Sequence, residues 1–315
     1  NRNRSTVTMT SNHHQSVMFT ESIDALNIIE DGIYIDATFG RGGHSQGVLD
    51  QLGDKARLIA FDQDISAIEY AQKNFNDPRL TLIHSPFSQM HRIIEELGLM
   101  GKINGILMDL GVSSPQLDNA ERGFSFMADG PLDMRMNQTT GLSAAQWLQE
   151  ASEEEIANVI YEFGDEKKSR HIASRIKKFQ LTQPLETTLQ LANIVSEVVY
   201  GQKKKHPATR TFQAIRIFIN QELKELTDTL ENSKDILAKN GRLSIISFHS
   251  TEDRIVKRFI QKNSRQKSLP KGLPIFDQAL EKMPLKDLSK KFASKEEVTH
   301  NKRSRSAILR VASKN

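Results

Sequence analysis

The chain of 315 residues contains no cysteine, and this absence excludes several classes of site. Without thiols there is no disulfide framework, no cysteine-ligated zinc site, no iron–sulfur cluster and no thiol nucleophile. Long apolar runs are also lacking, because a stretch such as residues 243–248 is far too short to cross a bilayer. The first dozen residues are polar and lack the apolar core of a signal peptide. We therefore expect a cytoplasmic protein without membrane association.

The net charge of +4 hides an uneven distribution along the chain. From Arg254 to the C-terminus there are 17 basic and 5 acidic residues, a net of +12. The preceding residues carry 26 basic and 34 acidic side chains, a net of −8. A basic region on a mildly acidic body is typical of proteins that bind nucleic acid, although a solvated lysine-rich surface would give the same counts.

Short apolar runs alternate with amphipathic stretches in the first third of the chain. Helices are predicted near residues 43–52, 65–75 and 87–97. They separate four predicted strands, at residues 33–37, 57–62, 80–84 and 103–110. Strands that alternate with helices in this way indicate βαβ units and a parallel sheet, hence an α/β fold.

The alternation of strands and helices stops after residue 110. Residues 111–141 are rich in Gly, Pro, Asp and Met and are expected to form a long ordered loop. Three capping boxes then predict helices that begin after Ser143, Ser152 and Thr187, with no strands between them. The sequence thus predicts an inserted all-helical domain at 118–207. It would interrupt a sheet domain made of 13–117 and 208–315, after a flexible extension at 1–12.

Apolar residues at spacings of three and four from Phe212 to Leu230 predict one long helix that returns to the sheet and ends at Gly241. Strands are expected at 242–248 and 306–311, and a helix at 255–260. The polar stretch 263–303, which contains three prolines, is expected to be partly mobile.

A glycine turn follows the first predicted strand. Gly40, Gly42 and Gly43 would let the backbone approach a ligand closely and would present amide N–H groups at a helix start. Asp62 ends the second strand, where doubly wound folds place an acid that binds ribose hydroxyls. Together they favour a site for a nucleoside-type cofactor over a purely structural turn.

The glycine spacing departs from the dinucleotide fingerprint, and the sequence contains no phosphate loop of the NTPase type. Asp36, Asp62 and Asp109 all lie at the C-termini of predicted strands, where open α/β sheets bind ligands. Carboxylates suit S-adenosylmethionine, which carries a sulfonium and an ammonium but no phosphate. Each acid would also be compatible with a structural role, because Asp caps helices and turns.

Six motifs resemble the bacterial 16S rRNA (cytosine-N4)-methyltransferase family. They are DATFGRGGHS at 36–45, DLGVSSPQLD at 109–118, RGFSFM at 122–127, DGPLDMRM at 129–136, HPATRTFQA at 206–214 and SFHSTEDR at 247–254. The resemblance implies a Rossmann-like class I methyltransferase sheet with an inserted helical domain. It also implies methyl transfer from S-adenosylmethionine to N4 of a decoding-centre cytosine, with 16S rRNA or the small ribosomal subunit as partner. A homodimer is compatible with the family.

The resemblance also implies the residues of the cofactor site. Gly42, Gly43 and His44 would form the turn, Asp62 would bind the ribose, Phe87 would contact the adenine, and Asp109 and Gln116 would complete the pocket.

The missing cysteine restricts the chemistry further, because methylation at C5 of a pyrimidine usually requires a thiolate that adds to the ring. An exocyclic amine instead attacks the sulfonium methyl in line, without a covalent enzyme intermediate. We hypothesise that Asp109 forms the target-amine site with Ser113 and Ser114; the alternative is that Asp109 serves only the cofactor. His249 is a second candidate for positioning or proton transfer, although a lone histidine is more often structural. No metal site is predicted, since the histidines lack ligand spacing such as His-Glu-x-x-His.

Two basic clusters are predicted to bind RNA phosphates, which orient an RNA without reading its sequence. They are Lys203, Lys204, Lys205, His206, Arg210 and Arg216 in one, and Arg254, Lys257 and Arg258 in the other. Phe124, Phe126 and Trp147 are candidates for stacking on a base, with core packing as the alternative. Two rival functions remain at this point: a non-catalytic RNA-binding assembly factor, and an NAD-linked oxidoreductase.

Overall fold

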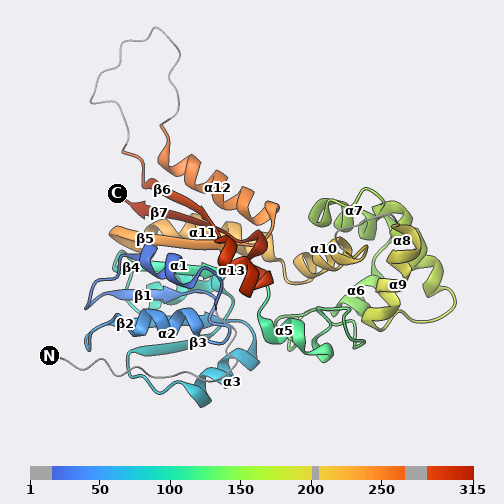
Figure 1. The fold of residues 1–315 in the computed structure, drawn as a ribbon, viewed down its shortest axis with the longest axis horizontal. Coiled ribbons are helices and arrows are strands. Elements are labelled where there is room, and N and C mark those ends of the chain that lie inside the picture. The colour runs from blue at the N-terminus through green and yellow to red at the C-terminus, as the bar shows by residue number, and fades with distance from the viewer. Residues whose placement is uncertain (1–15, 201–205, 267–281) are drawn as a thin grey trace, which may run out of the picture.

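The computed structural model describes residues 16–200, 206–266 and 282–315. A twisted sheet with helices on both faces occupies one side of the molecule, and a bundle of helices lies beyond the carboxyl ends of its parallel strands (Figure 1). The predicted α/β class, with a Rossmann-like sheet, is confirmed.

The sheet has seven strands in the order β3-β2-β1-β4-β5-β7-β6. They are β1 (Ile33–Asp36), β2 (Arg57–Asp62), β3 (Leu80–His84), β4 (Ile103–Asp109), β5 (Leu237–Ser247), β6 (Leu285–Phe292) and β7 (Ile308–Lys314). Strands β1 to β5 are parallel, and β7 runs antiparallel to both β5 and β6. The strand order reverses between β1 and β4, and ligands of open α/β sheets bind at such a switch point.

Successive strand residues face opposite sides of the sheet, so each face has its own core. Ile59 and Ile106 pack on one face, and their neighbours Leu58 and Leu107 pack on the other. The first face is covered by α4 (Met90–Glu96), α11 (Glu222–Ile236) and α12 (Ser250–Ser264). The second is covered by α1 (Phe19–Leu26), α2 (Gly43–Leu49) and α3 (Ile65–Asn74).

The helical region has a separate core. It contains α6 (Ala144–Glu150), α7 (Glu153–Gly164), α8 (Ser169–Gln180), α9 (Thr188–Val198) and α10 (Thr209–Ile219), which bury Leu148, Ile160, Ile176, Leu191 and Phe212 together. The three predicted capping boxes begin α6, α7 and α9. Sequence reasoning missed α8, which begins after Lys168 without a side-chain cap.

The prediction of one long helix from Phe212 to Leu230 is wrong. Helix α10 ends at Ile219 and α11 begins at Glu222, because Gln221 adopts a left-handed conformation with φ 49°. Phe212 belongs to the core of the helical region, whereas Leu230 belongs to the core of the sheet. A continuous apolar periodicity therefore serves two cores, and periodicity alone does not show where the chain passes from one to the other.

Gly241 does not end a helix, because α11 stops at Ile236 and Gly241 lies inside β5. The helix expected at 255–260 is longer, at Ser250–Ser264. The loop expected at 111–141 contains the short helix α5 (Ser114–Asp118) and the 3-10 turn η2 (Ala120–Arg122).

The polar stretch 263–303 includes β6 and α13 (Lys295–His300), while residues 267–281 lie outside the described part. The predicted extension at 1–12 also lies outside it. The division into 13–117 with 208–315 and 118–207 stays a prediction, although the packing of α10 favours a return to the sheet domain near Asn220. In the described residues, no helix combines the length and apolar character that a membrane span requires.

Candidate active site

The turn between β1 and α2 is built around glycines with positive φ. Gly40 has φ +57° and Gly42 has φ +76°, conformations that L side chains rarely adopt. A Cβ atom at Gly42 would collide with the ring of Phe75, whereas one at Gly40 would meet no atom within 4 Å. The turn is therefore closed on its inner side and open at Gly40, where a ligand can approach the backbone.

Asp62, at the end of β2, holds this turn. Its carboxylate accepts hydrogen bonds of 2.8 Å from the backbone N–H groups of Gly40 and Asp64. Burial raises the pKa of Asp62 to about 6, and the nearby charges of Asp64 and Asp36 act in the same direction. The predicted ribose acid thus lies beside the glycine turn as expected.

Two further acids end neighbouring strands. Asp36 is buried and accepts hydrogen bonds from the hydroxyl of Ser45 at 2.6 Å and the N–H of Thr38 at 3.0 Å. Asp109 has one buried carboxylate atom, Oδ1, without a hydrogen-bond partner. Burial, followed by the charges of Asp36 and Glu252, raises the pKa of Asp109 well above its usual value.

His44 lies in the first turn of α2, is buried and faces Asp109. Its Nε2 lies 3.1 Å from the carbonyl oxygen of Val17, and its Nδ1 lies 3.6 Å from Oδ2 of Asp109. Burial lowers the pKa of His44, which favours the neutral ring. Because a carbonyl only accepts, Nε2 carries the hydrogen and the lone pair of Nδ1 faces Asp109.

The chemistry of this donor set fits S-adenosylmethionine. Within the described residues, no lysine or arginine forms an ion pair with Asp36, Asp62 or Asp109. A cationic ligand would supply the missing positive charge, and Oδ1 of Asp109 offers an acceptor for an ammonium or an amine. The open side of Gly40 provides the close backbone approach that the cofactor needs.

The residues after β4 are engaged with one another. The side-chain oxygen of Gln116 accepts the N–H of Ser113 at 2.9 Å, and its Nε2 donates to Asp64 at 2.9 Å. Both ends of this amide are therefore occupied, so Gln116 supports the wall of the site. The Ser114 hydroxyl accepts a hydrogen bond from Arg303. The structure thus gives Ser113 and Ser114 structural contacts, and their catalytic roles stay predictions.

Phe87 begins the 3-10 turn η1 (Phe87–Gln89) after β3 and packs against the sheet core. Its contact with adenine stays a prediction.

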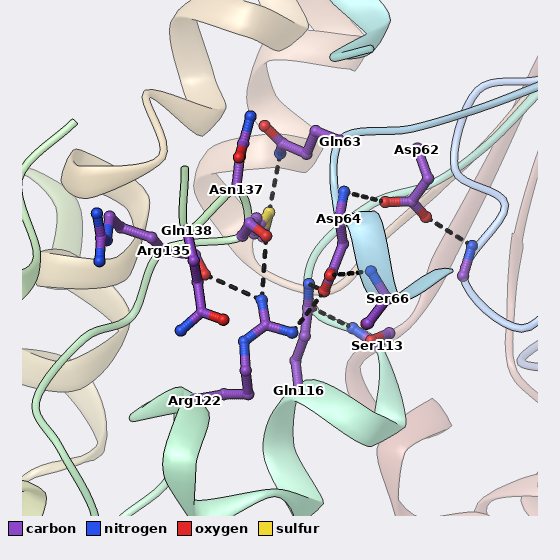
Figure 2. A network of polar contacts seen from close by, with 12 residues as sticks. Asp62, Gln63, Asp64, Ser66, Ser113, Gln116, Arg122, Arg135, Asn137 and Gln138 are labelled. Atoms are coloured by element: carbon purple, nitrogen blue, oxygen red, sulfur yellow. Dashed lines mark hydrogen bonds and ion pairs between the residues drawn. The ribbon is translucent and has the colours of Figure 1, made fainter. Parts of the chain in front are cut away.

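Sequence reasoning missed the pair formed by Asp64 and Arg122 (Figure 2). Nη1 of Arg122 lies 2.7 Å from Oδ2 of Asp64, and the two side chains are only 9% and 6% exposed. Burial opposes the charge of Asp64, but hydrogen bonds from Arg122 and Gln116 outweigh it and hold the pKa of Asp64 below its usual value. The available signals were the place of Arg122 at the start of the RGFSFM motif and that of Asp64 two residues after Asp62.

His249 caps α12 and faces Glu252, with Nε2 2.9 Å from Oε1 of that carboxylate. Burial opposes the charge of Glu252, but contacts with His249 and the charge of Arg216 outweigh it and lower its pKa. Potential ligand atoms of Glu222, His249 and Glu252 lie within 4.8 Å of one another. Arg216 already neutralises Glu222, so we assign no metal there. These contacts favour a capping role for His249, and its catalytic role stays a prediction.

Arg216 does not offer a free guanidinium to RNA. Its side chain is 14% exposed and binds both oxygens of Glu222, at 2.8 and 2.9 Å. The expected phosphate contact is replaced by an internal ion pair, because the α10–α11 junction folds Glu222 back towards α10. Trp147 and Phe124 are also buried, in agreement with core packing.

Comparisons with known proteins identify the family. Residues 11–315 match the MraW methylase family. The chain belongs to that family. It is 76% identical to "Ribosomal RNA small subunit methyltransferase H" of Ruthia magnifica subsp. Calyptogena magnifica, over 98% of this chain and 100% of that protein. It is 74% identical, with the same coverage, to the protein of that name from Vesicomyosocius okutanii subsp. Calyptogena okutanii (strain HA). An rRNA methylase structure from Streptococcus thermophilus aligns with a TM-score of 0.41 and 13% identity, over 93% of this chain and 94% of the other.

Membership in the MraW methylase family confirms the predicted methyltransferase class and S-adenosylmethionine as cofactor. The NAD-linked alternative is therefore wrong.

The structure describes only some of the other basic residues that were expected to bind RNA. Lys203, Lys204 and Lys205 lie outside the described residues, and nearby Arg210 is exposed and donates to the carbonyl of Asp165 at 3.1 Å. Arg254 and Lys257 are exposed on α12 together with Arg258, at spacings that place them on one face of the helix. Because α12 begins after His249, its N-terminus follows β5, which pairs with the strand β4 that ends at Asp109.

Proposed function

We propose that this protein transfers a methyl group from S-adenosylmethionine to the exocyclic N4 of a decoding-centre cytosine in 16S rRNA. The observation that carries the proposal is Asp109, a strand-end acid beside the glycine turn whose Oδ1 is buried without a partner. The names and the 74–76% identity of the two curated relatives support ribosomal RNA as the substrate. The alternative, a non-catalytic assembly factor, would have no use for such an acceptor.

The cofactor would be held by residues of the switch point. The open backbone at Gly40 and the Asp62 carboxylate would receive the nucleoside part, and the acids Asp36 and Asp109 would balance its positive charges. When bound, S-adenosylmethionine supplies an electrophilic methyl group for direct in-line attack by an amine.

Asp109 would act on the target amine. Its Oδ1 accepts a hydrogen bond from the N4 amine, which helps to localise the nitrogen lone pair. As the new C–N bond forms, the bond between the methyl carbon and sulfur would break and leave a neutral thioether. The amine would become acidic, and Asp109 would accept its proton. A raised pKa suits this role because it brings the proton affinity of the acid closer to the working pH. Neutral His44 lies beside the other carboxyl oxygen, with its Nδ1 3.6 Å away, which is too far for a hydrogen bond.

The basic face of α12 would bind the RNA backbone. Arg254, Lys257 and Arg258 can contact successive phosphates while a single extruded base enters the acidic site. The substrate would be 16S rRNA, free or within the small ribosomal subunit, in the cytoplasm. A homodimer stays a prediction that sedimentation equilibrium tests.

The decisive experiment supplies labelled S-adenosylmethionine with either naked 16S rRNA or unmethylated small subunits, and maps the methyl group by mass spectrometry of nucleosides. The expected product is N4-methylcytidine at one position. Label on another base, on a ribose, or on neither RNA contradicts the proposal. The Asp109→Asn variant serves as the control for transfer by this site.

A further inference from the structure

We propose that Arg122 is a positioning residue that couples cofactor binding at the glycine turn to the placement of the helical region, and so to RNA binding. The inference rests on the proposed function. Arg122 reaches neither the open side of Gly40 nor the acids Asp36 and Asp109 through any contact of the described residues. It acts through other groups, in a network that joins residues 62–64 to residues 135 and 136 (Figure 2).

The first half of the network leads to the glycine turn. Arg122 donates to Oδ2 of Asp64, and the backbone N–H of Asp64 donates to Asp62 at 2.8 Å. The second oxygen of Asp62 accepts the N–H of Gly40 at 2.8 Å. A ribose hydroxyl that donates to Asp62 would bind the same carboxylate that accepts these two N–H groups. Cofactor binding would therefore act directly on the first bonds of the network.

The second half leads to the helical region. Nη2 of Arg122 donates to the carbonyl oxygens of Arg135 and Met136, both at 3.0 Å. The N–H of Met136 donates to Oδ1 of Asn220 at 2.7 Å, and Nδ2 of Asn220 donates to the carbonyl of Met134 at 2.8 Å. Asn220 directly follows α10, which packs in the helical core. Arg122 therefore connects the sheet domain with the element that anchors the helices.

Only arginine fits this position. Its planar fork directs one nitrogen to a carboxylate and another to two carbonyl oxygens at the same time, whereas lysine places all its donors on one atom. The backbone around it is equally constrained. Gly123 has φ +74°, and a Cβ atom there would collide with the carbonyl oxygen of Pro131. The segment therefore has little freedom to adapt when the arginine is changed.

Coupling between two binding sites is reciprocal. If bound cofactor increases the affinity for RNA by some factor, bound RNA must increase the affinity for the cofactor by the same factor. The experiment uses S-adenosylhomocysteine, which has no methyl group to transfer, and a 16S rRNA fragment that contains the target cytosine. Calorimetry gives the affinity of each alone and in the presence of the other. For the unchanged protein we expect a coupling factor on the order of ten.

In Arg122→Lys, we expect each ligand alone to bind within about threefold of the unchanged protein while the coupling factor falls towards one. Asp64→Asn, an isosteric change at the partner, should act in the same way, and combining the two changes should add little. If Arg122→Lys does not fold, as judged by its thermal melt, Asp64→Asn still tests the inference. The matched control is Arg79→Lys, because Arg79 forms a comparable ion pair with Asp77 and contacts neither Asp64 nor residues 134–136; its coupling should be unchanged.

A coupling factor that is close to one in the unchanged protein, or that survives in folded Arg122→Lys and Asp64→Asn, overturns the inference. Failure of the proposed function looks different, since the unchanged protein would then transfer no methyl group to the RNA.

Discussion

Nδ1 of His44 faces Oδ2 of Asp109 at 3.6 Å, in a site where burial disfavours the charged form of both groups. Burial lowers the pKa of the histidine and raises that of the acid, so the pair does not form a conventional ion pair. The arrangement leaves Oδ1 of Asp109 as an acceptor with no partner from the described residues. This relationship makes Asp109 the residue whose replacement should affect methyl transfer most directly.

Asp109→Asn should lower the rate of methyl transfer by about 10² to 10⁴, the range expected when a general base is lost. In the unchanged protein the rate should rise with pH until the pKa of Asp109 is passed, because only the ionised carboxyl accepts a proton. The variant should lose this dependence. Single-turnover rates across pH, beside separate cofactor binding measurements, test this. Weakened cofactor binding with an unchanged transfer rate would assign Asp109 to the cofactor alone; the exposed Asp54→Asn serves as the control.

Cofactor affinity should depend on pH through Asp62. Its pKa in the folded protein is about 6. A ribose hydroxyl donates a stronger hydrogen bond to the ionised carboxylate than to the neutral acid, so cofactor binding favours loss of the proton from Asp62. Affinity should therefore be constant above about pH 6 and weaken by up to tenfold per unit below it. Calorimetry in two buffers of different ionisation enthalpy should detect the released proton. Asp62→Asn should bind weakly and without this dependence, whereas the exposed Asp50→Asn should keep it.

The triple variant Arg254→Ala/Lys257→Ala/Arg258→Ala should bind RNA less tightly at low salt. Each phosphate contact with single-stranded RNA contributes about 0.7 to the slope of log affinity against log salt concentration, so the slope should decrease by about 2. Filter binding at several salt concentrations measures it. As a control for net charge, Lys55→Ala/Lys73→Ala/Lys102→Ala removes three exposed lysines elsewhere. Equal slopes in the two variants would refute a specific role for α12.

Arg216→Met should destabilise the protein, because it leaves the buried charge of Glu222 without its partner. The expected loss in the free energy of unfolding is about 3 to 5 kcal/mol, measured by chemical denaturation. Adding Glu222→Leu should restore part of it. Arg210→Met, an exposed change on the same helix, should cost less than about 0.5 kcal/mol. Normal stability with weakened RNA binding in Arg216→Met would restore the phosphate role that the sequence suggested.

Much of the sheet could be predicted because its central strands are apolar runs between polar turns. Strand β6 could not, because it lies at the sheet edge with lysines exposed, and its sequence lacks the burial pattern that marks a strand. The break between α10 and α11 was also not predictable from the sequence pattern. Phe212 and Leu230 share one periodicity, although they belong to different cores.

The sequence by itself determined which acids lie at the carboxyl ends of the strands. Asp36, Asp62 and Asp109 were identifiable because parallel strands end at one edge of a sheet. The missing cysteine excluded the mechanism in which a thiolate adds to the cytosine ring. Only the tertiary structure decided which charges are free and which are paired. Asp64 and Arg122 are 58 residues apart, and Arg216 meets Glu222 only because the chain turns at Gln221. Such pairs cannot be recognised from the sequence around each residue, since burial and distance are properties of the folded chain.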